Sequence, residues 1–202
     1  MQRKTLYTIG HSTHEIDYFI GLLKAHNVNC VVDVRTLAAS RFNPQYNKSS
    51  LSASLRNHDI TYLHMPEEFG ARHTDESLLT NGRVDFDKVR RSASFRKGVE
   101  RLHHGINKGF SIAIMCAEAD PLVCHRFGLI SEGIKNEFEI IHILKDNSVI
   151  TNIDLENELL RKYKKKILTS DLFQSVHTHQ ERLAAALKLQ NEEIGYAHPS
   201  SQ

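Results

Sequence analysis

One short connection in the sequence, IMCAEADPLVCHR at positions 114–126, holds two thiols, a carboxylate, an imidazole and a guanidinium. A thiolate is both a nucleophile and a metal ligand, and carboxylates and imidazoles transfer protons. The connection is therefore predicted to be the chemical centre, with both cysteines and the glutamate as catalytic groups. The reactive residues are Cys116, Glu118, Cys124, His125 and Arg126.

Cys124, His125 and Arg126 stand where the connection is expected to become a helix. A helix N-terminus presents unpaired N–H groups and partial positive charge, which favour anions and lower the pKa of a cysteine. The planar fork of arginine suits phosphate or carboxylate. We therefore expect His125 and Arg126 to bind an anionic substrate. The competing interpretation is a buried cysteine beside an arginine in an internal ion pair.

The spacing of the cysteines gives weak support for a metal site. Structural zinc sites usually show short paired spacings such as C-x2-C, and these are absent from the sequence. The sequence requires no cofactor, and no residue is assigned as a metal ligand. A zinc site assembled from His11, Cys116 and Cys124 is left open.

The elements that must position these groups alternate between strands and helices. Apolar, β-branched runs predict buried strands, and helical spacings such as Ile16, Phe19 and Leu23 separate them. This order predicts an α/β fold, a three-layer sandwich with a mostly parallel sheet of about five strands and C-terminal helices. The predicted strands are Thr5–Gly10, Asn29–Val34, Ile60–His64, Phe110–Met115 and Glu139–Leu144.

Polar residues follow several of these strands, as expected for the functional edge of a parallel sheet. His11 and Ser12 end the first strand, and Asp33 and Arg35 end the second. We expect them to share a pocket with Cys116, with His11 and Asp33 as catalytic groups and Ser12 and Arg35 as substrate-binding groups. An internal ion pair between Asp33 and Arg35 is an equal alternative.

Arg41 extends this basic surface and is assigned to substrate binding, with Phe42 and Tyr46 as groups on which a base could stack. The stretch Met65–Asp87 lacks periodicity and is longer than most connections, which is typical of a lid or binding loop.

Three parts are predicted along the chain: an α/β core at 1–150 that carries the site, a helical extension at 151–195 packed on the core, and a disordered tail at 196–202. The 202 residues suit this size, and the net charge of +2 gives no global nucleic-acid signature. No secretory signal and no run of about 20 apolar residues is visible, so a cytoplasmic protein without membrane contact and with reduced thiols is expected. Cys30 is expected to be buried and inert.

Several motifs stand in the order of a known family: TIGHS at Thr8–Ser12, VDVR at Val32–Arg35, SRFNPQYN at Ser40–Asn47 and MCAEADPLVCHR at Met115–Arg126. HIL at 142–144 also fits. The chain resembles the Domain of unknown function 488 family from the first strand into the C-terminal helices.

Two departures concern loops. TLAAS follows Arg35 where the family often has a proline, and EFGAR stands where the family has an LGG-like element. The resemblance implies an α/β fold with the site on these motifs, and it implies no reaction. The matching signature residues are His11, Ser12, Asp33, Arg35, Cys116, Glu118, Cys124, His125 and Arg126.

The leading functional hypothesis is a thiol- or metal-dependent hydrolase or transferase that acts on a phosphate-bearing substrate, either a nucleotide or nucleic acid. The phosphatase arrangement of cysteine, five residues and arginine is absent, because Leu122 takes the arginine position after Cys116. One alternative is a non-catalytic nucleotide- or nucleic-acid-binding module. Another is a thiol redox or metal-site protein in which Cys116 and Cys124 form a reversible disulfide.

Overall fold

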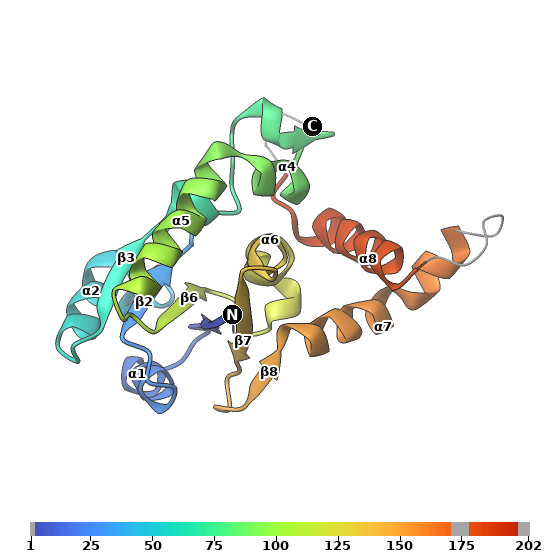
Figure 1. Cartoon of the computed structure of the whole chain (residues 1–202). Coiled ribbons are helices and arrows are strands. Elements are labelled where there is room, and N and C mark those ends of the chain that lie inside the picture. Colours follow the sequence, from blue (N-terminus) through green and yellow to red (C-terminus); the bar gives the residue numbers. More distant parts are fainter. Residues whose placement is uncertain (1–2, 171–177, 198–202) are drawn as a thin grey trace.

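A computed structural model describes residues 3–170 and 178–197 and shows a six-stranded sheet with helices on both faces (Figure 1). The strand order is β3-β2-β6-β1-β7-β8, and all neighbours are parallel except β7 and β8. The predicted α/β fold with a mostly parallel sheet is therefore confirmed. The strands are β1 (Lys4–Gly10), β2 (Cys30–Asp33), β3 (Thr61–His64), β6 (Ile112–Cys116), β7 (Phe138–Ile143) and β8 (Val149–Thr151).

The central strands are covered on both faces, which explains their continuous apolar sequences. Every residue of β2 and β6 is buried. Side chains alternate between the faces, so that Val31 joins one core cluster and Val32 the other. By the same alternation Cys116 lies on the face of Val32. Cys30 is 1% exposed in β2, and burial raises its pKa to about 11, as expected for an inert thiol.

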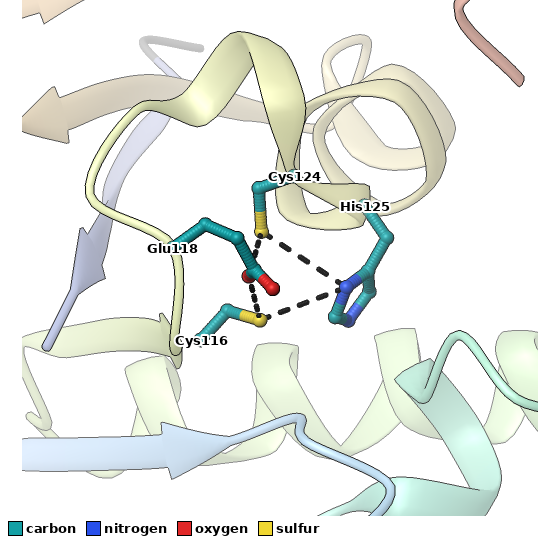
Figure 2. A group of neighbouring side chains, drawn as sticks. All are labelled: Cys116, Glu118, Cys124 and His125. Carbon is teal, nitrogen blue, oxygen red and sulfur yellow. Dashed lines mark hydrogen bonds between the residues drawn. The ribbon is translucent and has the colours of Figure 1, made fainter. Parts of the chain in front are cut away.

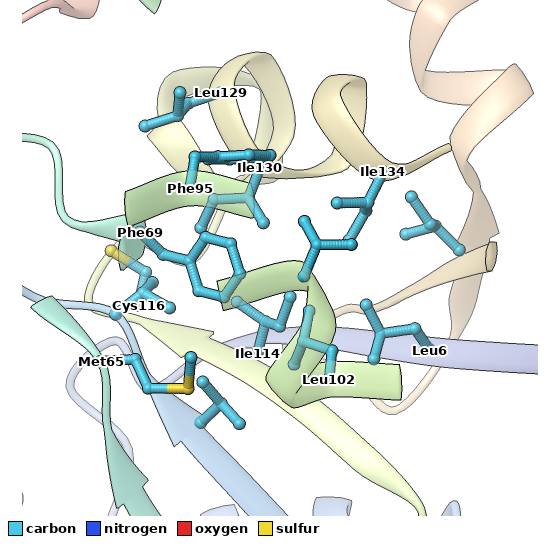
Figure 3. Packing of buried hydrophobic residues seen from close by; sticks show 14 of the residues in the cluster. Leu6, Met65, Phe69, Phe95, Leu102, Ile114, Cys116, Leu129, Ile130 and Ile134 are labelled. Atoms are coloured by element: carbon cyan, nitrogen blue, oxygen red, sulfur yellow. The ribbon is translucent and has the colours of Figure 1, made fainter. Parts of the chain in front are cut away.

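Each face of the sheet has its own set of helices. The core on one face uses α1 (Ile16–Ala25) and α2 (Lys48–Arg56), with Phe19 and Leu51 fully buried. The core on the other face is larger and is drawn in Figure 3. Its helices are α3 (Pro66–Phe69), α4 (Phe86–Arg91), α5 (Ala93–Asn107), the π-helix Arg126–Ser131 and α6 (Glu132–Ile134).

The connections after β1 and β6 leave toward opposite faces of the sheet. The chain passes from β1 to α1 on one face and from β6 to α6 on the other, although β1 and β6 are neighbours. In open α/β sheets such a divergence marks the usual place for a ligand site. The two strand ends stay joined beyond the sheet, because the His11 amide donates to the Cys116 carbonyl at 2.9 Å.

The stretch Met65–Asp87 contains short elements that the periodicity did not predict. After α3 come a 3₁₀ turn at Glu76–Leu78 and a hairpin of β4 (Leu79–Thr80) and β5 (Arg83–Val84). Asn81 and Gly82 join these strands with φ of 52° and 71°, the left-handed backbone that a tight hairpin needs. Strand β8 was not predicted from the sequence either, because three residues are too few to show an alternation of polar and apolar side chains. A further 3₁₀ turn spans Pro44–Tyr46.

The predicted C-terminal helices are α7 (Asn152–Ser170) and α8 (His179–Ile194). A capping box between Thr178 and Glu181 begins α8. Both helices bury apolar side chains against Phe127 of the π-helix. The division into a core at 1–150 and an extension at 151–195 stays a prediction.

Two residues of the predicted tail belong to the described part of the chain. Tyr196 accepts a hydrogen bond from the Val84 amide at 3.0 Å, and Ala197 bridges to Arg83. Residues 198–202 of that tail lie outside the described residues. Within residues 3–170 and 178–197, no helix combines the length and apolar character that crossing a membrane requires.

Candidate metal centre

Four side chains of the connection after β6 converge on one point (Figure 2). One ligand-type atom from each lies within 4.8 Å of all the others: two sulfurs, a carboxylate oxygen and an imidazole nitrogen. The connection therefore folds back on itself so that its reactive groups meet, as the sequence predicted for its chemical centre. The four residues are Cys116, Glu118, Cys124 and His125.

The contacts within this thiol cluster are short. Oε2 of Glu118 lies 2.8 Å from Sγ of Cys116 and 3.1 Å from Sγ of Cys124. Nδ1 of His125 lies 3.6 Å from the first sulfur and 4.0 Å from the second. All three cysteines of the chain are free thiols.

Local sequence features bring the two ends of the connection together. Cys116 is the last residue of β6, and a 3₁₀ turn at Pro121–Val123 reverses the chain. Asp120 caps this turn by accepting from the Leu122 amide at 2.8 Å. Cys124 follows in an extended conformation and so faces back toward the strand end.

Three of the four groups are shielded from solvent and one is not. Cys116 is 3% exposed, Cys124 1% and His125 9%, whereas Glu118 is an exposed residue. The cluster is therefore a buried set of two sulfurs and one nitrogen, and the carboxylate of an otherwise exposed residue reaches in to contact both sulfurs.

The surroundings shift the pKa values of the two thiols in opposite directions. Burial raises the pKa of Cys116 well above its ordinary value, and the hydrogen bond and charge of Cys124 reinforce this. Burial acts in the same direction on Cys124, but the hydrogen bond from Cys116 and the charge of Arg126 outweigh it and hold the pKa of Cys124 well below its usual range. Cys124 is thus the favoured thiolate.

The pKa values of Glu118 and His125 also shift, in the directions that limit the negative charge of the cluster. Burial raises the pKa of Glu118, and the charge of Cys124 adds to this. Burial lowers the pKa of His125, yet the hydrogen bond and charge of Cys124 outweigh it, so that this pKa is raised. Full deprotonation would bring the three negative charges of two thiolates and a carboxylate together, and a divalent cation would offset two of them.

These donor types and distances fit zinc. Zn²⁺ prefers four ligands of sulfur, nitrogen and oxygen, with bonds of about 2.0 to 2.3 Å in a tetrahedron, so its ligand atoms lie roughly 3 to 4 Å apart. The four atoms found here already lie within that range or close to it. The sequence left open a zinc site with His11, but the structure places His125, not His11, beside the two thiols.

A second cluster lies at the ends of β1 and β2, and its polar groups are hydrogen-bonded to one another. Arg35 donates from Nε and Nη2 to the two carboxylate oxygens of Asp33, at 2.9 and 2.7 Å. Tyr62 donates to Asp33 at 2.7 Å, and the carbonyl of Tyr46 accepts from Arg35 at 2.8 Å. Asp33 is fully buried. These bonds favour the internal ion pair over a substrate-facing pair.

His11 belongs to this second cluster. Its Nε2 lies 3.0 Å from Nη1 of Arg35, which can only donate, so Nδ1 carries the proton and donates to the Ser12 carbonyl at 2.7 Å. The ring stacks on Tyr46 with centroids 4.0 Å apart. Burial and the charge of Arg35 lower the pKa of His11 to about 4. Both ring nitrogens are engaged, which favours a structural role over the predicted catalytic one.

Arg126 is fully buried and turns back into the connection that precedes it. Its guanidinium donates to the carbonyls of Glu118 and Ala119, at 2.5 and 2.8 Å. This geometry favours a role in holding the backbone, because a buried fork bonded to carbonyls cannot meet an external anion. The interpretation of the sequence considered only carboxylates as internal partners of Arg126, and therefore did not include a role in holding the backbone.

The remaining predicted residues lie at the same edge of the sheet. Ser12 has a left-handed backbone with φ of 51° and donates its amide to the Ala117 carbonyl. Arg41 is exposed, with its guanidinium 4.7 Å from the ring centre of Phe42, which is 77% exposed. The predicted residues thus share the carboxyl edge of the sheet but form two clusters there, plus the exposed Arg41.

Sequence reasoning missed Tyr62 as the partner of Asp33. The only signal for this contact is the register of the sheet, in which β3 pairs with β2 and Tyr62 lies opposite Val31. Tyr46, expected to stack on a base, is fully buried against His11. A cavity of about 570 Å³ lies elsewhere, between α4, α6 and α8, and none of the thiol-cluster residues lines it.

A family model described as Domain of unknown function DUF488 matches residues 15–131, more than half of the chain. The chain therefore belongs to this family, as its motifs indicated. The match includes the whole connection with the thiol cluster and the Asp33–Arg35 pair, whereas His11 and Ser12 precede it. No curated protein matches the chain.

Proposed function

We propose that this protein is a zinc-dependent enzyme, a hydrolase or transferase, whose metal ion is held by Cys116, Cys124 and His125. The observation that carries the proposal is the convergence of four zinc-type donor atoms within 4.8 Å. Glu118 is the fourth group of this set. Its oxygen contacts both sulfurs, and it is the exposed member of the cluster.

The asymmetry of the cluster supports a catalytic centre over a purely structural one. Structural zinc sites are closed by four firm ligands, whereas catalytic sites use three and leave one position for water or substrate. Here the three buried residues form the firm set, and Glu118 is the one exposed residue of the four, with a carboxylate that can transfer a proton. When bound, Zn²⁺ would supply Lewis acidity and lower the pKa of water at that position.

The substrate that we propose is phosphate-bearing, a nucleotide or nucleic acid. Its support is the exposed pair of Arg41 and Phe42 on the loop after β2, at the same sheet edge as the centre. Guanidinium groups bind phosphate and aromatic rings stack on bases. The other two predicted arginines lend no support, because Arg35 and Arg126 are bonded internally.

Elemental analysis of the purified protein tests the metal directly. We expect about one zinc per chain, and a cobalt-substituted protein with sulfur-to-cobalt charge-transfer absorption. Cys124→Ser should lower zinc affinity by about tenfold or more. Cys30→Ser is the matched control, because Cys30 is equally buried but lies outside the cluster. A wild-type protein that takes up no zinc or cobalt would refute the proposal.

Activity on simple phosphate esters tests the reaction. Nitrophenyl phosphate mono- and diesters are suitable probes, with zinc-loaded wild type compared with Cys124→Ser and Arg41→Ala. We expect the first variant to lose turnover and the second to raise KM with kcat nearly unchanged, since Arg41 would act in binding alone. Zinc-loaded protein that turns over neither ester, nor any nucleotide, would count against the proposed substrate class.

A second candidate function is a thiol redox pair. It is favoured by one observation: Sγ of Cys116 and Sγ of Cys124 both contact the same oxygen of Glu118. A peroxide would oxidise the two thiols to one disulfide and would itself be reduced to water. Metal-free protein should then lose the mass of about two hydrogens, reversibly with a dithiol. Retention of both free thiols under mild peroxide would exclude this candidate.

A further inference from the structure

The turn that returns the chain to the thiols is held from outside the connection. The 3₁₀ turn Pro121–Val123 reverses the chain between Cys116 and Cys124. Its Leu122 carbonyl accepts a hydrogen bond from Nε2 of Gln190 at 2.7 Å. Gln190 belongs to α8 and is fully buried, although it lies 68 positions from Leu122 along the chain. A side chain of the C-terminal helix therefore reaches the backbone of the connection just before Cys124.

The amide of Gln190 can take only one orientation here. A carbonyl oxygen only accepts hydrogen bonds, so the NH₂ group of the amide must face Leu122. The amide oxygen lies beside Gly128 of the π-helix, where an added methyl group would come within 2.3 Å of it. This oxygen has no hydrogen-bond partner among the described residues. A methionine would fill the same space without an unpaired side-chain atom, so what the glutamine adds is its bond to Leu122.

The helix that carries Gln190 is itself fixed to the core. α8 lies alongside α6 and the π-helix that precedes it, and it packs on the π-helix through one buried cluster (Figure 1). The next residue, Asn191, accepts from the Phe86 amide and donates to the Val84 carbonyl, each at 2.8 Å. Neighbouring amides of one helix thus bond to two different places, Gln190 to the connection with the centre and Asn191 to α4 and β5. Because α8 lies outside residues 15–131, the bond to the connection comes from beyond the family match.

We propose that Gln190 is a positioning residue of the centre, because its bond to the Leu122 carbonyl fixes the turn that returns Cys124 to the end of β6. Cys124 and His125 directly follow this turn, whereas Cys116 is held by the sheet. A turn that is fixed before zinc arrives spares the cost of ordering these ligands on binding, so its loss weakens zinc affinity. Gln190 touches neither metal nor substrate and acts through the backbone of the turn.

The inference rests on the proposed zinc site, and zinc affinity together with cobalt absorption tests it. We expect Gln190→Met, which keeps the length of the side chain without its donor, to weaken zinc binding by about tenfold in competition with a chromophoric chelator. In cobalt-substituted protein the same variant should lose sulfur-to-cobalt absorption, because Cys124 is no longer held in place. Asn191→Leu is the matched control, because it also removes an amide of α8 that bonds to backbone groups but leaves Leu122 bonded. It should bind zinc within about threefold of wild type, with an unchanged cobalt spectrum.

The outcomes separate this inference from the proposed function. A wild type that takes up neither zinc nor cobalt overturns both. A wild type that binds zinc, with Gln190→Met unchanged or with Asn191→Leu equally weakened, overturns the role of Gln190 alone, since the second result would show a general effect of loosening α8.

Thermal melts of the metal-free proteins control for folding. If Gln190→Met does not fold, Gln190→Asn decides in its place, because its shorter side chain keeps the amide but cannot reach the Leu122 carbonyl. We expect the same tenfold loss of zinc affinity in that variant. Wild-type affinity in Gln190→Asn would overturn the proposal.

Discussion

Gly10, the last residue of β1, lies directly under the backbone of Glu118. A methyl group on its α-carbon would overlap the carbonyl oxygen of Glu118, which is backbone and cannot swing away. The same carbonyl accepts the hydrogen bond from Arg126. The end of β1 and the guanidinium of Arg126 thus fix the position from which the Glu118 carboxylate reaches the thiols.

Gly10→Ala should therefore damage both stability and the centre. We expect a loss of about 1 to 3 kcal/mol in the free energy of unfolding, typical of overpacking, together with weaker zinc binding. Urea unfolding and chelator competition measure the two effects. Gly21→Ala is the control, because nothing lies within 4 Å of an added methyl group in α1, and it should gain up to about 1 kcal/mol. Equal behaviour of the two variants would contradict this packing argument.

Arg126→Lys is expected to lower stability. A lysine keeps the charge but lacks the planar fork, so at least one of the Glu118 and Ala119 carbonyls loses its partner. An unsatisfied buried carbonyl costs about 1 to 3 kcal/mol, measurable by urea unfolding. The anion-binding role that the sequence analysis gave Arg126 would lead instead to a loss of anion affinity with folding intact. A lysine variant with unchanged stability but at least tenfold weaker phosphate binding would restore that interpretation.

The stability of the protein should fall when the Asp33–Arg35 pair loses one of its charges. Asp33→Asn leaves a nearly buried guanidinium without its carboxylate, and breaking a buried pair in this way costs about 3 to 5 kcal/mol. Tyr62→Phe removes only one hydrogen bond to the carboxylate and should cost about 1 to 3 kcal/mol. Chemical denaturation of both variants checks the order. A cost for Asp33→Asn below that for Tyr62→Phe would show that the pair is not a structural element.

Stability should fall on acidification through the buried histidines. Burial and the charge of Arg35 lower the pKa of His11 to about 4, from an ordinary value of 6.5, so the folded state resists protonation that the unfolded state accepts. The contribution of His11 is complete above pH 6.5 and is lost progressively as the pH falls to about 4, to a total of roughly 3 kcal/mol. Burial lowers the pKa of His142 to about 3, with the same sign.

Comparison of wild type with His11→Asn from pH 8 to pH 4 isolates this effect. The difference between their unfolding free energies should be constant above pH 6.5 and should change by up to about 3 kcal/mol in favour of the variant as the pH falls to 4. A difference that does not vary with pH would mean that His11 is protonated equally in both states.

The sequence by itself determined the order of the longer strands and helices and the short connection on which the thiol cluster lies. Apolar runs of four residues or more carry a strong signal, because both faces of the inner strands are covered. The four donors of the centre all come from one short connection, so no long-range contact was needed to predict that they meet. The three-residue strand β8 and the hairpin β4–β5 were too short for periodicity to reveal.

Only the tertiary structure decided which reactive groups are free. Arg126 and Arg35 donate to backbone carbonyls, and every residue has a carbonyl, so no sequence pattern marks these acceptors. The imidazole that lies beside the two thiols was decided in the same way, since Arg35 occupies the free nitrogen of His11 while His125 turns Nδ1 toward the thiols. Residue types set what chemistry the chain can perform. The partners that folding brings within hydrogen-bond distance decide which of those groups remain available for it.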